Sequence, residues 1–274
     1  MIAQLFSDIG GIWAKYGTVY LNGIANTLVL AVVATLLGCL IGFICGILQT
    51  IPYTRQDPLI KRILLKLIRV VIRVYVEVFR GTPMILQAVF IYYGMPYFFG
   101  VVFKNIWTVS IIVVSVNTGA YMAESVRGGI MSIDPGQFEG AKAIGMNHFQ
   151  TMVYVVLPQT LRNIMPQIGN NYIINVKDTS VMFIIGFQDF FAVHKMVSGA
   201  VFKYFPSAFL EMGGYLFLTL LASFLLRKLE KKLEGKSDYE LVNTDQLVMT
   251  AGTYNYPGEP PYEEKSRDFK GGPQ

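Results

Sequence analysis

The segment DPGQFEGAKAIGMNHFQTMVYVVLPQ, residues 134–159, carries the local signals of two short helices joined by a turn. Asp134 can cap a helix whose first residue is Pro135, and Gln137 is placed to complete a capping box by reaching back to the Asp134 amide. Gly145 is placed to end this helix in a left-handed conformation. The first half of the segment is therefore predicted to be a helix that stops at a sharp turn.

The second half of the segment repeats these signals. Asn147 and Gln150 have the spacing of a second capping box, for a helix that runs up to Pro158. A self-capped elbow over residues 134–157 is a stiff body that can be pushed as a unit, as coupling to a motor requires. On capping signals alone, a structured loop without a partner is an equal alternative.

The rest of the chain reads as an all-α membrane protein. Hydrophobic residues make up 53% of the sequence and charged residues 15%, against about 25% charged in an average soluble domain. Residues 16–54 contain no Asp, Glu, Lys or Arg, and a span needs about 20 apolar residues. Hydropathy predicts five transmembrane helices, over residues 22–49, 68–93, 106–127, 155–178 and 206–227.

The positions of basic residues predict the topology. They crowd the link after the first helix and the segment after the last, so both places are expected to be cytoplasmic; the residues are Arg55, Lys61, Arg62, Lys66, Arg69, Arg73, Arg227, Lys228, Lys231 and Lys232. With five spans, the N-terminus is then outside and the C-terminus inside. The loops 50–67 and 128–154 are expected inside, and 94–105 and 179–205 outside. Residues 1–17 form an extracytoplasmic leader, 18–230 a permease domain, and 235–274 a disordered cytoplasmic tail.

The second predicted helix is weak as an isolated span. Arg73, Glu77 and Arg80 follow one another at spacings of four and three, so they share one side of the helix and can form ion pairs there. A charge facing lipid would cost several kcal/mol. This side is therefore expected to face protein, water or headgroups. Gly81 and Pro83 would break or kink the helix, and Pro158 and Pro166 would interrupt the fourth.

The sequence of the elbow resembles the signature of a known protein family. Its residues match, at complete spacing, the EAA-type signature of ATP-binding-cassette (ABC) importer permeases, in which Glu-Ala-Ala, three residues and Gly are followed after nine residues by Ile, any residue, Leu and Pro. Gly140 and Val155 depart from the signature, and neither changes charge or adds bulk. The resemblance implies that the elbow inserts into a groove of the ATP-binding subunit. It assigns coupling roles to Glu139, Gly140, Ala141, Gly145, Leu157 and Pro158.

Other segments resemble the polar amino-acid branch of that family, among them EVFRGTPMILQAVFIYYG from Glu77 and LPQTLRNIMPQIGNNYIINVKDTS from Leu157. The resemblance covers most of residues 18–230. It implies a MetI-like permease fold with a cytoplasmic coupling helix, in the bacterial cytoplasmic membrane. It also implies four kinds of partner: an ATP-binding subunit that holds ATP and Mg, an extracytoplasmic solute-binding protein, a second copy or a related permease, and the amino acid itself.

Polar residues inside the predicted helices are candidates for the substrate pathway, because such groups are costly in a membrane unless they serve a purpose. On the third helix, residues 117, 121 and 124 share a face by helical spacing. The alternatives are that the amides join helices by hydrogen bonds, that Lys177 with Asp178 holds a loop, and that Glu124 and Arg127 form interhelical ion pairs. The candidates are Asn117, Tyr121, Glu124, Asn170, Asn171, Lys177 and Asp178.

Several other functions find no support in the sequence. His148 and His194 lack any spacing typical of a metal site and are expected to be polar surface, and Cys39 and Cys45 are expected to be packing residues. Gly235 belongs to no nucleotide-binding loop, because Glu230 stands where the first glycine of that motif is needed. No cofactor, nucleic acid or catalytic activity is expected. The alternatives to an importer subunit are a self-sufficient ion-coupled transporter or channel, and a membrane scaffold without transport. The sequence does not determine which amino acid is transported, or whether the permease forms a homodimer or a heterodimer.

Overall fold

The computed structural model describes residues 2–234, and every regular element in this range is helical. The expected cytoplasmic tail at 235–274 lies outside the described residues. The elements are α1 (Ile2–Thr50), α2 (Leu59–Gly81), α3 (Met84–Val89), the π-helical turn η1 (Phe90–Gly94), α4 (Met95–Phe99), α5 (Ile106–Met131), α6 (Pro135–Ala143), α7 (His148–Thr151), the π-helical turn η2 (Met152–Val156), α8 (Leu157–Asp178), the 3-10 helix η3 (Thr179–Ile185), α9 (Phe190–Val201) and α10 (Tyr204–Glu234).

Three of the described helices, α1, α5 and α10, are long and apolar enough to cross a membrane. A fourth span results if α7 to η3 and α9, which meet at a bend of 55°, are counted together. The second predicted span, 68–93, overlaps α2, which does not meet this standard because charged residues run along its length. The all-helical membrane fold is thus confirmed, and α2 is the weakest of the five predicted spans.

Several predicted boundaries are wrong. The first helix, predicted over 22–49, begins at Ile2, so the expected leader forms its opening turns. In these turns Ile12 is buried against α9 and Asp8 pairs with Lys203 at 2.7 Å, which explains why the leader is ordered. The fourth helix is not interrupted at Pro166, since α8 runs through it.

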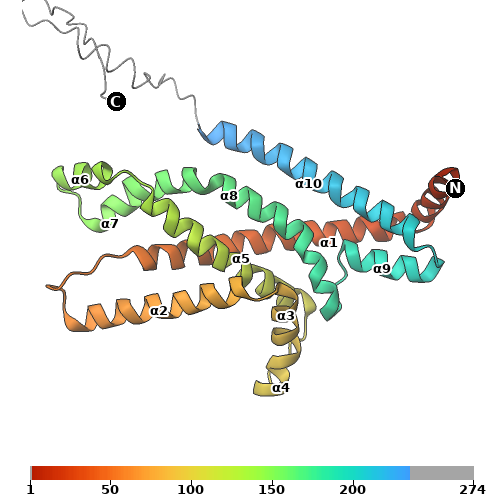
Figure 1. Cartoon of the computed structure of the whole chain (residues 1–274), viewed down its shortest axis with the longest axis horizontal. Helices are drawn as coiled ribbons and strands as arrows, with labels where there is room; N and C mark the ends of the chain where they lie inside the picture. Colours follow the sequence, from red (N-terminus) through yellow and green to blue (C-terminus); the bar gives the residue numbers. More distant parts are fainter. Residues whose placement is uncertain (1, 235–274) are drawn as a thin grey trace, which may run out of the picture. The chain divides into compact units, whose positions relative to one another are not determined.

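The second predicted helix, 68–93, is broken in two. α2 starts in the predicted inner loop and ends at Gly81; Thr82 is extended, as expected of a residue before proline, and α3 begins after Pro83. The break predicted from Gly81 and Pro83 is therefore confirmed. In Figure 1, α3 and α4 turn away from the direction of α2 and extend outward, transverse to the long helices.

The long helices run lengthwise beside one another (Figure 1). One end of this helical unit carries the α1–α2 link and the elbow of α6 and α7. The other end carries the start of α1 together with α9. The two loops predicted to face the cytoplasm, 50–67 and 128–154, therefore lie at the same end.

The centre of the unit is the contact between α1 and α5. Gly38, Gly42 and Gly46 recur every fourth residue and bring one face of α1 against the side chains of α5. A Cβ at Gly38 would lie 2.6 Å from the Cβ of Thr118, and one at Gly42 would overlap Met122. Small residues at this spacing allow close approach of membrane helices.

The contact is continued by apolar clusters on both sides. One cluster joins α1, α3, α5 and η3; its buried members include Leu30, Val113 and Phe187. A second joins α5 to the elbow and α8 through Val126, Met152 and other buried side chains. α5 is therefore packed along its length, and the elbow is attached to it by buried apolar contacts.

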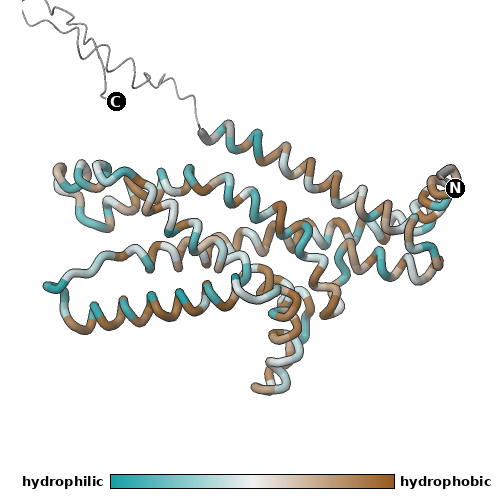
Figure 2. Tube along the Cα trace, viewed as in Figure 1, coloured by the Kyte–Doolittle hydropathy of each residue, from teal (hydrophilic) through white to brown (hydrophobic). Residues whose placement is uncertain are grey.

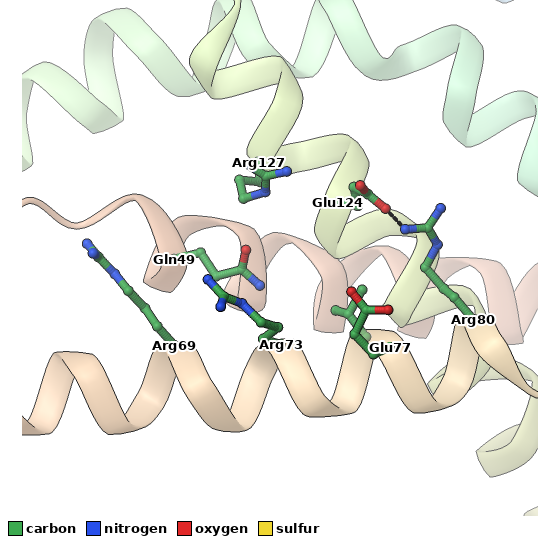
Figure 3. A pocket seen from close by; sticks show the side chains of 8 residues that line it. Gln49, Arg69, Arg73, Glu77, Arg80, Glu124 and Arg127 are labelled. Carbon is green, nitrogen blue, oxygen red and sulfur yellow. Dashed lines mark ion pairs between the residues drawn. The ribbon is translucent and has the colours of Figure 1, made fainter.

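α2 is amphipathic in an inverted sense. Its apolar side chains, such as Ile60, Leu67 and Val74, are exposed in this chain, whereas several of its charged residues face α1 and α5 (Figures 2 and 3). A soluble helix has the opposite arrangement. The outer face of α2 is thus suited to lipid or another subunit, and the expectation that its charges face protein or water is met.

The close contact of α1 with α5 predicts opposite effects of two equivalent substitutions in α1. Gly42→Ala places a methyl group into Met122 and should destabilise the protein by about 1–3 kcal/mol. Gly10→Ala meets nothing within 4 Å and should be neutral or stabilise the helix by up to about 1 kcal/mol. Thermal unfolding of the detergent-solubilised protein measures both, and equal melting temperatures would contradict the proposed packing.

Candidate functional site: the helical elbow and the polar cavities

The first turn of the elbow is capped by Asp134. Its carboxylate accepts a hydrogen bond of 2.6 Å from the amide of Gly136, and Pro135 is the first residue of α6. The predicted capping box with Gln137 is wrong. The side chain of Gln137 instead accepts a hydrogen bond of 3.1 Å from the side-chain amide of Gln159 in α8.

The turn between α6 and α7 agrees with the sequence prediction. Gly145 adopts a φ of +81°, a conformation that side-chain-bearing residues rarely adopt. The backbone amide of Gly145 donates a hydrogen bond to the carbonyl of Lys142. The backbone amide of Met146 donates one to the carbonyl of Ala141. Asn147 and Gln150 then form the predicted capping box, with both hydrogen bonds at 2.9 Å.

The elbow combines a buried base with an exposed surface. Ala141 is buried and Phe138 packs on the cluster that contains Met152, which fixes α6 to α5 and α8. Ile144 is 79% exposed and Phe149 is 73% exposed. The tip therefore exposes apolar side chains, whereas the base is held by buried apolar contacts.

The residues assigned to coupling do not form one surface. Glu139 and Gly140 are exposed on α6, and Gly145 is exposed at the turn. Leu157 and Pro158 lie where η2 passes into α8. Glu139 also lines a cavity of about 640 Å³, here called the elbow cavity, between the elbow and the ends of α1 and α5.

A second cavity, here called the polar cavity, lies where α2 breaks. It has a volume of about 580 Å³ and is lined by the backbone of the break and by one face each of α5 and α8. Residues 167, 171, 175 and 178 of α8 recur at helical spacing along this face. The lining residues are Arg80, Gly81, Thr82, Pro83, Met84, Asn117, Thr118, Tyr121, Gln167, Asn171, Ile174, Asn175 and Asp178.

Amide side chains hold the broken helix in place. The amide of Gln87 donates to the carbonyls of Phe79 and Thr82, at 2.9 and 3.0 Å, and Asn117 donates to Phe79 and to the Gln87 side chain at 3.1 and 3.0 Å. These bonds satisfy carbonyls that the break leaves without a helical partner. Asn117 therefore has a structural role beside any role toward a substrate.

Other amides in the wall of the polar cavity connect neighbouring helices. Asn175 donates to Thr35 of α1 and to Thr118 of α5, at 2.8 and 3.0 Å, so one side chain joins three helices. Asn171 donates to the carbonyl of Gln167 within α8 and to the sulfur of Met122. Neither Gln87 nor Asn175 was predicted as a site residue; the spacing of amides on α8 is the signal that identifies Asn175.

A third cavity, here called the arginine cavity, lies between α2, α5 and the end of α1 (Figure 3). Its volume is about 360 Å³. Arg80 of α2 pairs with Glu124 of α5 at its edge, and the Arg80 guanidinium also lies 5.3 Å from the centre of the Tyr121 ring. The lining residues are Gln49, Arg69, Arg73, Val76, Glu77, Arg80, Glu124 and Arg127.

The structure distributes the predicted pathway residues among different places. Asn117, Tyr121, Asn171 and Asp178 line the polar cavity. Glu124 lies in the arginine cavity, paired with another helix as the sequence analysis considered. Asn170 faces a groove between α8 and α10, and Lys177 is exposed and lines none of these cavities. Ion pairs along α2 were also expected, but Arg80 pairs across to α5 instead.

The histidines and cysteines differ in their surroundings. His148 is exposed, as predicted, but the prediction for His194 is wrong: it is 1% exposed and lies 2.8 Å from the Ser207 hydroxyl. No group of three or more His, Cys, Asp or Glu side chains suited to a metal occurs within residues 2–234. Cys39 and Cys45 are free and half-buried in α1.

Comparison with known proteins gives consistent results. Residues 38–235 match the family model of the binding-protein-dependent transport system inner membrane component. The glutamine transport system permease protein GlnP of Escherichia coli (strain K12) is 35% identical over 161 residues, which cover 59% of this chain and 74% of that protein.

Solved structures show the same fold. A chain from the crystal structure of an amino acid ABC transporter with histidines superposes with a TM-score of 0.70 at 32% identity, covering 80% of this chain and 96% of that one. A chain of the methionine ABC transporter MetNI in an inward-facing conformation gives a TM-score of 0.64 over 80% of this chain and 98% of that one. At 18% identity, this second likeness shows the fold alone.

The geometry of the elbow predicts different effects of alanine at two of its glycines. Gly145→Ala forces a side chain into the left-handed region and should destabilise the turn by about 1 kcal/mol or more. Gly140→Ala has open space and a helical backbone, and should stabilise α6 by up to about 1 kcal/mol. Hydrogen exchange of amides 137–147 measures both changes. Exchange that is faster in Gly140→Ala than in the wild type, or unchanged in Gly145→Ala, would contradict this description.

Proposed function

Since this chain belongs to the family of binding-protein-dependent transport system inner membrane components, we propose that it is the membrane-embedded subunit of an ABC importer for polar amino acids. The observation that carries the proposal is the elbow: a capped, rigidly based helical turn with EAA-type spacing, which a self-sufficient transporter or channel does not require. The chain itself is a transport permease and not an enzyme. Hydrolysis of ATP, with its Mg, is assigned to a separate subunit.

Coupling to that subunit is assigned to the elbow. The exposed apolar tip at Ile144 and Phe149 is suited to a groove on the ATPase, and the buried contacts of Phe138 and Ala141 transmit its movement to α5 and α8. Closure of paired ATPases on ATP would move two such elbows together and open the pathway outward; hydrolysis would reverse this. Glu139, Gly145, Leu157 and Pro158 shape the elbow and its exit into α8.

Passage of the amino acid is assigned to the polar cavity. A zwitterion needs a cation for its carboxylate, an anion or carbonyl for its ammonium group, and donors for a polar side chain. Arg80, Asp178 and the amides of Asn171 and Gln167 supply these groups around one space. Tyr121 and Asn117 complete the wall. Asn170 and Lys177, which face elsewhere, receive no substrate role in this proposal.

The remaining partners follow from the family. An extracytoplasmic solute-binding protein would deliver the amino acid, and a second permease, identical or related, would complete the pathway. The apolar outer face of α2 and the exposed face of α10 provide surfaces for such a copy and for lipid. The proposed setting is a bacterial cytoplasmic membrane, with five spans, the N-terminus outside and the elbow inside.

A substitution at the tip tests coupling. Ile144→Gln replaces a 79%-exposed apolar contact and should abolish most ATP-driven amino-acid uptake while the protein remains folded and in the membrane. Val102→Gln, at a 72%-exposed position remote from the elbow in the chain, is the matched control and should retain uptake. Uptake into proteoliposomes that contain the complex is the measurement. Undiminished uptake by the first variant would exclude the elbow as the coupling element.

Cysteine labelling tests the orientation. In a variant with Cys39 and Cys45 replaced by serine, a cysteine at Ile144 should react with a membrane-impermeant maleimide only after the cells are permeabilised. A cysteine at Val102 should react in intact cells. The reverse pattern would place the elbow on the external surface and contradict the proposal.

A further inference from the structure

The arginine cavity has a charge that the proposed pathway does not explain. Four arginines and two glutamates line it, so its formal charge is +2. The α2 members follow one another by helical spacing and point toward α5 and α1 (Figure 3). The remaining charged groups, Glu124 and Arg127, come from α5, and α1 contributes Gln49. A concentration of guanidinium groups in a space of about 360 Å³ attracts oxyanions.

Two of the four guanidinium groups have neither a carboxylate nor a carbonyl partner among the described residues. Glu124 is used by Arg80. Arg69 donates to the carbonyl of Ile51 and lies 4.6 Å from the centre of the Tyr53 ring. Within residues 2–234, Arg73 and Arg127 have no carboxylate within 4.0 Å, although Glu77 lines the same cavity.

The arginine cavity stands between the other two cavities. Arg80 lines both the polar cavity and the arginine cavity, with its ion pair to Glu124 at the boundary. Gln49 and Arg127 line both the arginine cavity and the elbow cavity. The three spaces therefore form a series that leads from the break in α2 to the elbow.

We propose that the arginine cavity is a carboxylate site on the route of the amino acid, and that its charge selects amino acids whose side chains carry no positive charge. The carboxylate of the amino acid replaces Glu124 at Arg80 and is then held by Arg73 and Arg127. A cationic side chain would be repelled by the same groups, whereas a neutral or acidic one is accepted. This inference rests on the proposed function and narrows its substrate class to neutral polar and acidic amino acids.

The test is direct binding to the complex of this permease with its ATPase, in phosphatidylcholine nanodiscs and without the solute-binding protein. Radiolabelled glutamine, glutamate and arginine are the probes. The wild type should bind glutamine or glutamate at least about tenfold more tightly than arginine. Arg73→Gln and Arg127→Gln should each weaken that binding by roughly tenfold, the effect of losing one charged hydrogen bond, and should reduce the discrimination against arginine.

Two controls separate charge from structure. Arg73→Lys keeps the charge and should retain the preference, although with weaker binding because the planar fork is lost. Lys66→Gln removes an exposed positive charge from the same helix, outside the cavity, and should change nothing. Each variant is compared at equal monodispersity.

The outcomes distinguish the inference from its premise. If the wild type binds arginine as tightly as glutamine, or if both glutamine variants keep the wild-type preference, the arginine cavity does not select the substrate. If phosphatidylglycerol in the nanodiscs displaces the amino acid from the wild type only, the cavity holds a lipid phosphate and the inference is wrong. If the wild type binds none of the three amino acids, the proposed substrate pathway itself is contradicted.

Discussion

The close approach of α1 to α5 is the constraint on which the rest of this structure depends. In a bilayer there is little hydrophobic drive for helices to associate, so shape decides which faces meet. The row at Gly38, Gly42 and Gly46 removes side chains from one face of α1 and lets α5 settle against it. α5 then supplies a wall of the polar cavity and of the arginine cavity, and runs directly into the elbow at Asp134.

The break in α2 shows how an irregular backbone is maintained inside this fold. Ending a helix at Gly81 exposes carbonyls that would be costly in a membrane unless they are satisfied by protein or water. Gln87 and Asn117 satisfy them, and Asn175 ties the neighbouring helices together. The polar cavity thus consists in part of the groups that stabilise the break. A substitution in it will change stability and transport together, which is why charge-altering changes in the adjacent arginine cavity are more informative.

Sequence reasoning succeeded where the structure is determined locally. The caps at Asp134 and Asn147, and the left-handed Gly145, depend only on near neighbours and were predicted correctly. It failed where a distant partner decides. Gln137 bonds to Gln159 instead of its own helix, and His194 is buried because Ser207 of α10 offers it a partner. No spacing in the chain specifies that Arg80 meets Glu124, since this requires knowing how α2 lies on α5.

The central claim is that the elbow and α5 move as one body when ATP acts on the complex. Spin labels at Ile144 on the elbow and at Ile112 on α5, both accessible, measure this directly by pulsed electron paramagnetic resonance. The comparison is between the nucleotide-free complex and the ATP-bound complex, with closure of the ATPase verified in the same sample. The account predicts an unchanged distance distribution between the two labels. A shift or broadening on ATP binding would show that the elbow moves independently of α5 and would contradict it.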